Sequence, residues 1–406
     1  MSAPTRLRLT TRGKIALAVL AVIALLLLTL GILGVRALLD RGDGEGDSFA
    51  AAAPVGPSST TVMVHATRIE GDISPKSVVA SSDGTVIANN MIYNHTVTVY
   101  DAAGMTETAT VPDTVDLADF GFPAERAGQT QGAPVEAAFS ADGRYAYVTQ
   151  YGLKGPGSGE PSTDECTGGE GIGRSAIFRM DMETLQWDQV IEVGRVPKFL
   201  TLSPDGATAL VSNWCDSTVS VVDLEAGQEV RTIEVDAAPR GSVILPDGRT
   251  AYVTAMYADE LYRLDLEAGT SELVRETGRK PRHLTLSPDG TRVYMTEAGA
   301  DRLVVMDAET AEIIDTAPTG REPRSMAIST DGTALYVVNY YENTVSKFDA
   351  ATLEELQRED VGVHPVGVAY EPTQHRVWVA NYQGTIDVFD DHAPAAVRNP
   401  VDEAGG

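Results

Sequence analysis

Residues 203–223 read SPDGATALVSNWCDSTVSVVD, and the same pattern returns at residues 287–307 as SPDGTRVYMTEAGADRLVVMD. Further copies fill residues 245–265 and 329–349. The aspartates of these four turns recur every 42 residues, as Asp205, Asp247, Asp289 and Asp331. Each copy places a turn rich in Pro, Asp and Gly before short runs of Val, Tyr and Thr, which are typical of strands. A period near 40 with several short strands predicts a β-propeller, because one four-stranded sheet buries both faces only between neighbours.

Extending the period in both directions predicts seven blades. The remaining turns fall at Asp83, at Asp142 and, in degenerate form, at residues 371–374. The third strand of each blade is predicted to end at an aspartate: Asp101, Asp181, Asp223, Asp265, Asp307, Asp349 and Asp390. No fourth strand follows Asp390, but Thr67-Arg68-Ile69-Glu70 has the pattern of one. We therefore predict an all-β, seven-bladed propeller of four-stranded blades over residues 60–391, in which the N-terminal strand completes the last blade and protects its edge.

The N-terminal segment predicts a membrane anchor. Residues 15–35 are uncharged and apolar over a length that spans a bilayer as a helix. Basic residues precede this segment, so residues 1–14 are predicted to be cytoplasmic and the propeller extracytoplasmic at the cell membrane. Residues 36–59 are predicted to be a flexible linker, and residues 392–406 a disordered tail. The alternative is a cleaved signal peptide, which would give a secreted protein.

The charge balance excludes one class of partner. The chain has a formal net charge of −27, and all 58 acidic residues lie at or after Asp40, against 26 of the 31 basic ones. A domain with this charge repels phosphate backbones, so general nucleic-acid binding is not expected.

The repeat resembles that of the YVTN-family seven-bladed β-propellers, through Tyr252-Val253-Thr254 and Val337-Val338-Asn339. The resemblance implies the fold. It implies no particular site, because relatives in this superfamily include surface-layer and secreted binding proteins, lactonases, and domains of periplasmic oxidoreductases.

One ring of equivalent positions is basic. The residue after the proline that begins each inner strand is Lys or Arg in five blades and Val135 or Val366 in the other two: Lys76, Lys198, Arg240, Arg282 and Arg324. Equivalent positions in a closed ring lie at equal radius near the channel mouth, where these cations predict capture of a small anion. His364 and His283 could join this site. The alternative is that each arginine pairs with an acid of a neighbouring blade, for which Glu322 and Glu297 are available.

Two insertions lie on the same predicted face as the basic ring. The first lies between Asp101 and Pro134, and the second, between Gln150 and Asp181, contains Cys166. The other cysteine, Cys215, follows in the equivalent loop of the next blade. A disulfide between them is predicted, with free thiols or metal ligation as alternatives. No standard zinc site is expected, because no histidine pattern accompanies the cysteines.

These features predict a binding module with no assigned cofactor. Aromatic residues on the predicted rim would contact a protein or cell-envelope partner: Trp214, Tyr257, Tyr340, Tyr341 and Tyr382. One alternative is a lactonase-like hydrolase acting on an anionic sugar lactone, with His364 or Glu297 transferring protons. Another is an accessory domain of an extracytoplasmic oxidoreductase. Nucleophile-elbow and haem-attachment motifs are absent from the sequence, so catalysis has no motif to support it.

Overall fold

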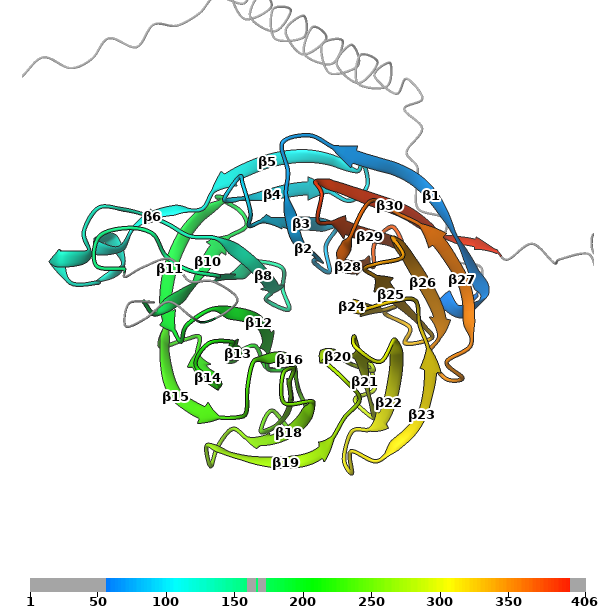
Figure 1. The fold of residues 1–406 in the computed structure, drawn as a ribbon. Coiled ribbons are helices and arrows are strands. Elements are labelled where there is room, and N and C mark those ends of the chain that lie inside the picture. The colour runs from blue at the N-terminus through cyan, green and yellow to red at the C-terminus, as the bar shows by residue number, and fades with distance from the viewer. Residues whose placement is uncertain (1–55, 159–165, 167–172, 395–406) are drawn as a thin grey trace, which may run out of the picture. The chain divides into compact units, whose positions relative to one another are not determined.

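The computed structural model describes residues 56–158, 166 and 173–394. These residues form seven four-stranded antiparallel sheets, which stand as blades around a central axis (Figure 1). The prediction of an all-β, seven-bladed propeller is confirmed. Within the described ranges, no helix is long and apolar enough to span a bilayer. The predicted anchor at residues 15–35 lies outside those ranges.

The first three blades follow one another along the chain. Blade 1 contains β2 (Pro75–Ala80), β3 (Thr85–Asn90), β4 (Thr96–Asp101) and β5 (Thr106–Pro112). Blade 2 contains β8 (Pro134–Phe139), β9 (Tyr145–Gln150), β10 (Ser175–Asp181) and β11 (Gln186–Val193). Blade 3 contains β12 (Pro197–Leu202), β13 (Thr208–Asn213), β14 (Thr218–Asp223) and β15 (Gln228–Glu234).

The next three blades keep the 42-residue period. Blade 4 contains β16 (Pro239–Ile244), β17 (Thr250–Ala255), β18 (Glu260–Asp265) and β19 (Thr270–Glu276). Blade 5 contains β20 (Pro281–Leu286), β21 (Arg292–Glu297), β22 (Arg302–Asp307) and β23 (Ile313–Pro318). Blade 6 contains β24 (Pro323–Ile328), β25 (Ala334–Asn339), β26 (Thr344–Asp349) and β27 (Glu355–Asp360).

Blade 7 joins the two ends of the propeller. It contains β28 (Pro365–Glu371), β29 (Arg376–Asn381), β30 (Thr385–Pro394) and, as its outer strand, β1 (Thr61–Glu70). The prediction that an N-terminal strand completes the last blade is confirmed, and Arg68 pairs with Asp387 in the ladder. The prediction that the third strand ends at Asp390 is wrong for this blade. Because β1 pairs with β30 from Thr61 to Glu70, with two register shifts, β30 continues to Pro394.

The first insertion forms a small substructure of its own between blades 1 and 2. It contains β6 (Thr114–Asp116), η2 (Leu117–Phe120), η3 (Ala124–Arg126) and β7 (Gln129–Gln131), and β6 pairs with β7. Val115 and Leu117 are buried against Phe178 of β10. The insertion is therefore fixed to blade 2 through a hydrophobic contact.

The tyrosines of the second strands hold neighbouring blades together. Tyr252 in blade 4 donates its hydroxyl hydrogen to the Ala308 carbonyl oxygen of blade 5 at 3.0 Å. Tyr294 of blade 5 makes the same bond to Ala350 of blade 6 at 2.9 Å. Both rings are buried, so each tyrosine contributes apolar area and also satisfies its one polar group.

The turn aspartates cap the hairpins between the first and second strands. Asp289 Oδ1 accepts hydrogen bonds from Ser287 Oγ at 2.6 Å and from the Thr291 amide at 3.0 Å. These bonds stabilise the carboxylate and lower the pKa of Asp289 to about 2. The following Gly290 has φ of 71°, a value that glycine adopts without strain.

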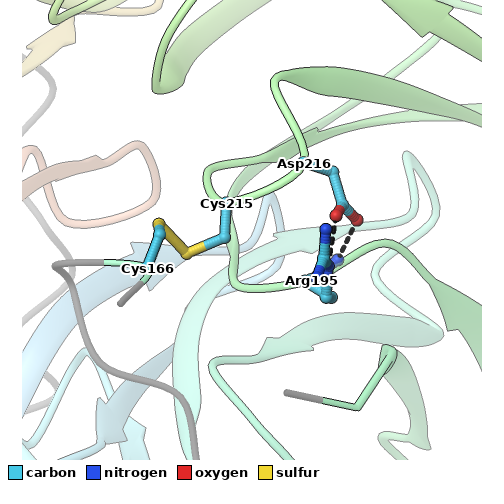
Figure 2. Close-up of a disulfide and its surroundings, with 4 residues drawn as sticks. All are labelled: Cys166, Arg195, Cys215 and Asp216. Carbon is cyan, nitrogen blue, oxygen red and sulfur yellow. Dashed lines mark hydrogen bonds and ion pairs between the residues drawn. A yellow bond between two sulfur atoms is a disulfide. The ribbon is translucent and has the colours of Figure 1, made fainter. Parts of the chain in front are cut away.

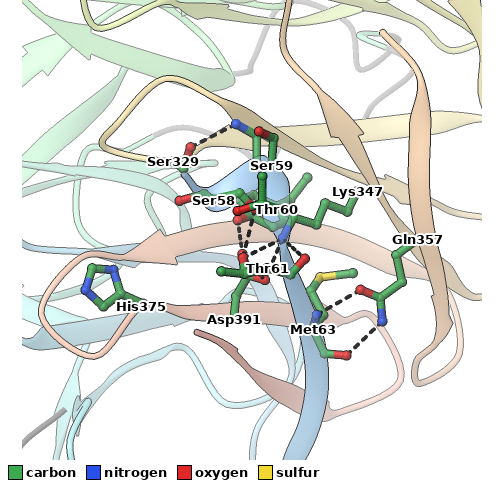
Figure 3. A network of polar contacts seen from close by, with 12 residues as sticks. Ser58, Ser59, Thr60, Thr61, Met63, Ser329, Lys347, Gln357, His375 and Asp391 are labelled. Atoms are coloured by element: carbon green, nitrogen blue, oxygen red, sulfur yellow. Dashed lines mark hydrogen bonds and ion pairs between the residues drawn. The ribbon is translucent and has the colours of Figure 1, made fainter. Parts of the chain in front are cut away.

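A short segment before β1, η1 (Ser58–Thr60), fastens the N-terminal side of the propeller to blade 6. The Ser58 amide donates to Asp331 Oδ2 at 2.7 Å, and Asp331 belongs to the blade 6 turn. Farther along, the Met63 backbone amide donates to Gln357 Oε1 and the Met63 carbonyl oxygen accepts from Gln357 Nε2, both at 2.8 Å (Figure 3). The chain thus enters the propeller on the face that carries the hairpin turns.

Candidate functional site

A local irregularity positions the basic ring. Each inner strand begins with a proline, and the strand register shifts directly after it in all seven blades. In blade 5, for example, Pro281 faces Glu297 and His283 faces Thr296, so Arg282 stands outside the regular register of the ladder. An extra residue of this kind is a β-bulge, which re-aims a side chain. The repeat thereby turns one residue per blade out of the regular pairing.

The bulges bring four of the five predicted cations to one cavity on the channel. It is lined by Lys76, Val135, Glu136, Phe199, Arg240, Arg282, His283, Arg324, Ser325 and Val366. The cavity measures about 10 Å³, roughly the room that one water-sized group needs. The two valines occupy the equivalent positions of blades 2 and 7. Four of the seven equivalent positions thus contribute a cation to the lining and two contribute a valine.

Lys198, the fifth predicted cation, does not line this cavity. Its side chain is buried, and Nζ lies 4.4 Å from the ring centre of Tyr151 and 5.2 Å from that of Trp214. Its backbone carbonyl oxygen accepts a hydrogen bond of 2.9 Å from Arg240 Nη1. Lys198 therefore helps to hold Arg240, and its own charge is directed toward aromatic rings.

The cations in the cavity repel one another. Burial lowers the pKa of Lys76 well below its ordinary value, and Arg240, Arg282, Lys198 and Arg324 lower it further. Arg324 is partly neutralised, because its Nε donates to Glu322 Oε1 at 2.8 Å. Glu322 was named as a possible partner, but it lies only two residues before Arg324 in the chain and does not belong to a neighbouring blade. An anion bound beside Lys76 would oppose the repulsion that lowers the pKa of this lysine.

Glu136 and His283 also face the cavity. Burial raises the pKa of Glu136 to about 7, against the opposing effects of Arg240, its backbone and side-chain hydrogen bonds, and Lys76. Burial together with Arg240 and Arg282 lowers the pKa of His283 to about 3, so the imidazole is neutral at physiological pH. Sequence reasoning named His283 but missed Glu136. The signal was available, because Glu136 and His283 hold the same position, two residues after the proline of their blades.

The two residues predicted as weak catalytic candidates lie elsewhere. Glu297 is 1% exposed, accepts the Gly278 amide at 2.7 Å and pairs with Arg302 Nε at 2.6 Å. Its carboxylate thus stabilises the end of a strand. His364 stacks on Tyr340, with ring centres 4.4 Å apart, and lines a separate groove. Neither side chain lines the cation cavity, so a catalytic role for either stays a prediction without support from its position.

The five aromatic residues predicted to form the rim differ in exposure. Tyr257 and Tyr341 are 61% and 51% exposed, whereas Tyr340 and Tyr382 are half-buried. Trp214 is 6% exposed and packs edge-on against Tyr257, with ring centres 4.9 Å apart. Its burial follows from its packing against Val196, Ala238 and Met256. A partner could contact Tyr257 and Tyr341 directly, but little of Trp214.

The predicted disulfide is confirmed. Cys166 and Cys215 are bonded, with their Cα atoms 5.3 Å apart (Figure 2). Beside Cys215, the Asp216 carboxylate accepts hydrogen bonds from the Arg195 backbone amide, at 2.6 Å, and from its guanidinium group. The disulfide therefore links the second insertion to a loop of blade 3 that is itself held by polar contacts.

Comparison with known proteins supports the fold and leaves the site open. A family model described as "Lactonase, 7-bladed beta-propeller" matches residues 304–404, about a quarter of the chain. The matched region includes Arg324 and Val366 but not Lys76, Arg240 or Arg282. A comparison with curated protein sequences gives no match.

A similar solved structure is a hydrazine synthase of Kuenenia stuttgartiensis. The two chains are 19% identical and superpose with a TM-score of 0.62, over 80% of this chain and 98% of the other. Identity at this level shows a shared fold. This chain is a seven-bladed β-propeller, and its function has to be argued from its own cavity.

Proposed function

We propose that the propeller is an extracytoplasmic binding module that captures a small anionic group in the cation cavity and is tethered by residues 15–35. The observation that carries this proposal is the convergence of Lys76, Arg240, Arg282 and Arg324 on one cavity. The rest of the chain has a large negative charge, so positive potential is concentrated where these side chains meet.

The size of the cavity limits what enters it. A volume of about 10 Å³ admits one water-sized group, such as a carboxylate or phosphate oxygen or a monoatomic anion. A larger ligand would place only its anionic end between the arginines. Arginine suits this task because its guanidinium group offers several donors in a fixed plane.

The described entry point of the chain lies away from this cavity. Ser58 is bound to Asp331 in a hairpin turn, whereas Arg324 lies at the opposite end of the same inner strand, β24. The segment through which the chain enters therefore does not cover the cavity. A protein or cell-envelope partner on the face with the insertions stays a prediction.

The test is anion binding to the full-length chain in detergent. Thermal shifts would be measured with acetate, phosphate and chloride at constant ionic strength, beside an Arg240→Ala/Arg282→Ala/Arg324→Ala variant. The matched control is Arg249→Ala, an exposed arginine in the Asp247 turn. We expect a shift for the native chain and the control, and none for the triple variant. Equal shifts in all three proteins would disprove the anion site.

A second function, lactone hydrolysis, is favoured by the position of Glu136. Opening a lactone adds one water across its ester bond, so one group must take a proton from water and return it to the leaving alkoxide. A carboxyl group with a pKa of about 7 can do both, and the adjacent arginines would stabilise negative charge on the carbonyl oxygen. A lactonase family model matches residues 304–404, which include Arg324 but not Glu136. Loss of lactone opening in Glu136→Gln, with anion binding retained, would support it; unchanged turnover would disprove it.

A further inference from the structure

An aromatic groove lies beside the cation cavity, between blades 6, 7 and 1. It has a volume of about 530 Å³, within the range of small-molecule sites. Its lining comes from interblade and interstrand loops: Ile73, Ser74, Ile92, Tyr93, Tyr340, His364, Tyr382, Gln383 and Gly384. Three tyrosines and a histidine thus surround a space large enough for a ring-shaped ligand.

One side of the groove is a stack of three planar groups. The Arg324 guanidinium carbon lies 3.2 Å from the ring centre of Tyr340. His364 is stacked on Tyr340 with an interplanar angle of 10°. Tyr341 meets His364 edge-on, with ring centres 6.2 Å apart. These contacts fix the orientation of the rings before any ligand arrives, which lowers the entropy lost on binding.

The other side of the groove also reaches the cation cavity. Lys76 Nζ lies 5.7 Å from the ring centre of Tyr382. Tyr93, which also lines the groove, is 83% exposed. Lys76 and Arg324 therefore each line the cavity and contact a tyrosine of the groove. A ligand seated in the groove would have its near end within reach of the cations.

We propose that the groove binds the ring of an aromatic carboxylate, whose carboxylate group enters the cation cavity. This inference rests on the proposed anion-binding function and adds the chemical class of the ligand. Aromatic side chains bind a ligand ring through edge and face contacts, which stabilise a complex beyond the burial of apolar area.

The polar groups in the groove favour an aromatic ring over a sugar. Ser74 is buried, and its hydroxyl already donates to Asn94 Oδ1 at 2.8 Å. Ile73 and Ile92 add apolar surface, and Gln383 supplies the one side-chain amide among the lining residues. A sugar has several hydroxyls, and each that is buried without a partner weakens binding.

The experiment compares three acids by calorimetry on the full-length chain in detergent: acetate, phenylacetate and glucuronate. We expect phenylacetate to bind at least about tenfold more tightly than acetate, because ring burial adds to the same carboxylate contact. Tyr382→Leu and Tyr93→Leu should each weaken phenylacetate binding toward the value for acetate and leave acetate unchanged. The matched control is Tyr257→Leu, an exposed tyrosine on blade 4.

The outcomes separate this inference from the function on which it rests. Acetate and phenylacetate binding equally well would disprove the groove and keep the anion site. Tighter binding of glucuronate than of phenylacetate would disprove the aromatic class. Absence of binding by all three acids would overturn both proposals. If Tyr382→Leu does not fold, Tyr93→Leu decides, because its highly exposed side chain contributes little to the fold.

Discussion

Lys347 and Asp391 form an ion pair to which solvent has no access. Lys347 Nζ donates to Asp391 Oδ1 at 2.6 Å, and neither side chain has exposed surface. The ammonium group also donates to the carbonyl oxygen and hydroxyl of Thr61, both at 2.9 Å (Figure 3). One buried charge thus connects blade 6, the end of β30 and the start of the closing strand β1. Closure of the ring depends on this contact as well as on strand pairing.

Replacing Lys347 with methionine should therefore destabilise the ring. Lys347→Met leaves the Asp391 carboxylate buried without its cation, and removal of one partner of such a pair costs about 3–5 kcal/mol. The midpoint of urea unfolding measures the effect. Lys347→Met/Asp391→Leu should recover much of the loss, because no unpaired charge remains. The comparison is Arg249→Ala at an exposed ion pair, where a loss below about 1 kcal/mol is expected. A similarly small loss in Lys347→Met would contradict this account.

The disulfide should stabilise the folded chain. Cys166 and Cys215 are separated by 49 residues in sequence. A disulfide across such a loop lowers the entropy of the unfolded chain and so raises the free energy of unfolding by about 2–4 kcal/mol. Cys166→Ser/Cys215→Ser should lower the unfolding midpoint, and reduction of the native chain should lower it equally. The double variant should not respond to reductant. A native chain that is fully reduced by mass spectrometry, with an unchanged midpoint, would show that the bond contributes no stability.

Anion binding should weaken as the pH rises through 7. The carboxylate of Glu136 competes with a bound anion for the arginines, and its pKa is about 7 in the folded protein. Protonation removes the competitor, so the affinity for acetate should fall roughly tenfold between pH 7.5 and pH 8.5. Glu136→Gln should lose less affinity over this pH range than the native chain does.

Lys76 also weakens acetate binding as the pH rises. Its pKa lies well below the ordinary value, so its ammonium group loses its charge at a lower pH than that of an ordinary lysine. Lys76→Arg keeps that charge and isolates the contribution of Glu136. If the affinity of Lys76→Arg for acetate does not change between pH 6 and pH 8.5, the competition by Glu136 is disproved.

Asp113 should make the protein less stable at higher pH. Its side chain is fully buried, and neither carboxylate oxygen has a hydrogen-bond partner among the described residues. Burial raises its pKa well above the ordinary value, with a smaller opposing effect from Gln150. The folded protein then holds a proton that the unfolded chain releases above its lower pKa, so the free energy of unfolding falls as pH rises through that window.

Asp113→Asn removes this proton linkage. The variant should unfold at a higher urea concentration than the native chain at pH 8, and the difference should shrink toward pH 4. The control variant is Gln150→Leu, which removes the side-chain amide that lowers the pKa of Asp113 and keeps the titrating carboxyl group. An advantage for Asp113→Asn that is equal at both pH values would mean that titration of Asp113 is not the cause.

The fold could be predicted in detail because it depends on short-range patterns that repeat. Turn residues such as Asp289 and Gly290 act within their own hairpin, so their spacing alone locates each blade. The closing strand was predictable because the last blade lacks a fourth strand and residues 67–70 supply the missing pattern. The extension of β30 past Asp390 was not, because it depends on pairing with β1, more than 300 residues away in sequence.

The sequence by itself determined the seven-bladed ring and which positions are equivalent in it, since the repeat gives Arg240, Arg282 and Arg324 the same place in successive blades. Only the tertiary structure decided what each side chain does there. It directs Lys198 toward Trp214, pairs Glu297 with Arg302, and places Glu136 among the arginines. The physical reason is that hydrogen bonds, ring contacts and pKa values depend on neighbours in space, both within a blade and across blades, and the identities of these neighbours differ from repeat to repeat.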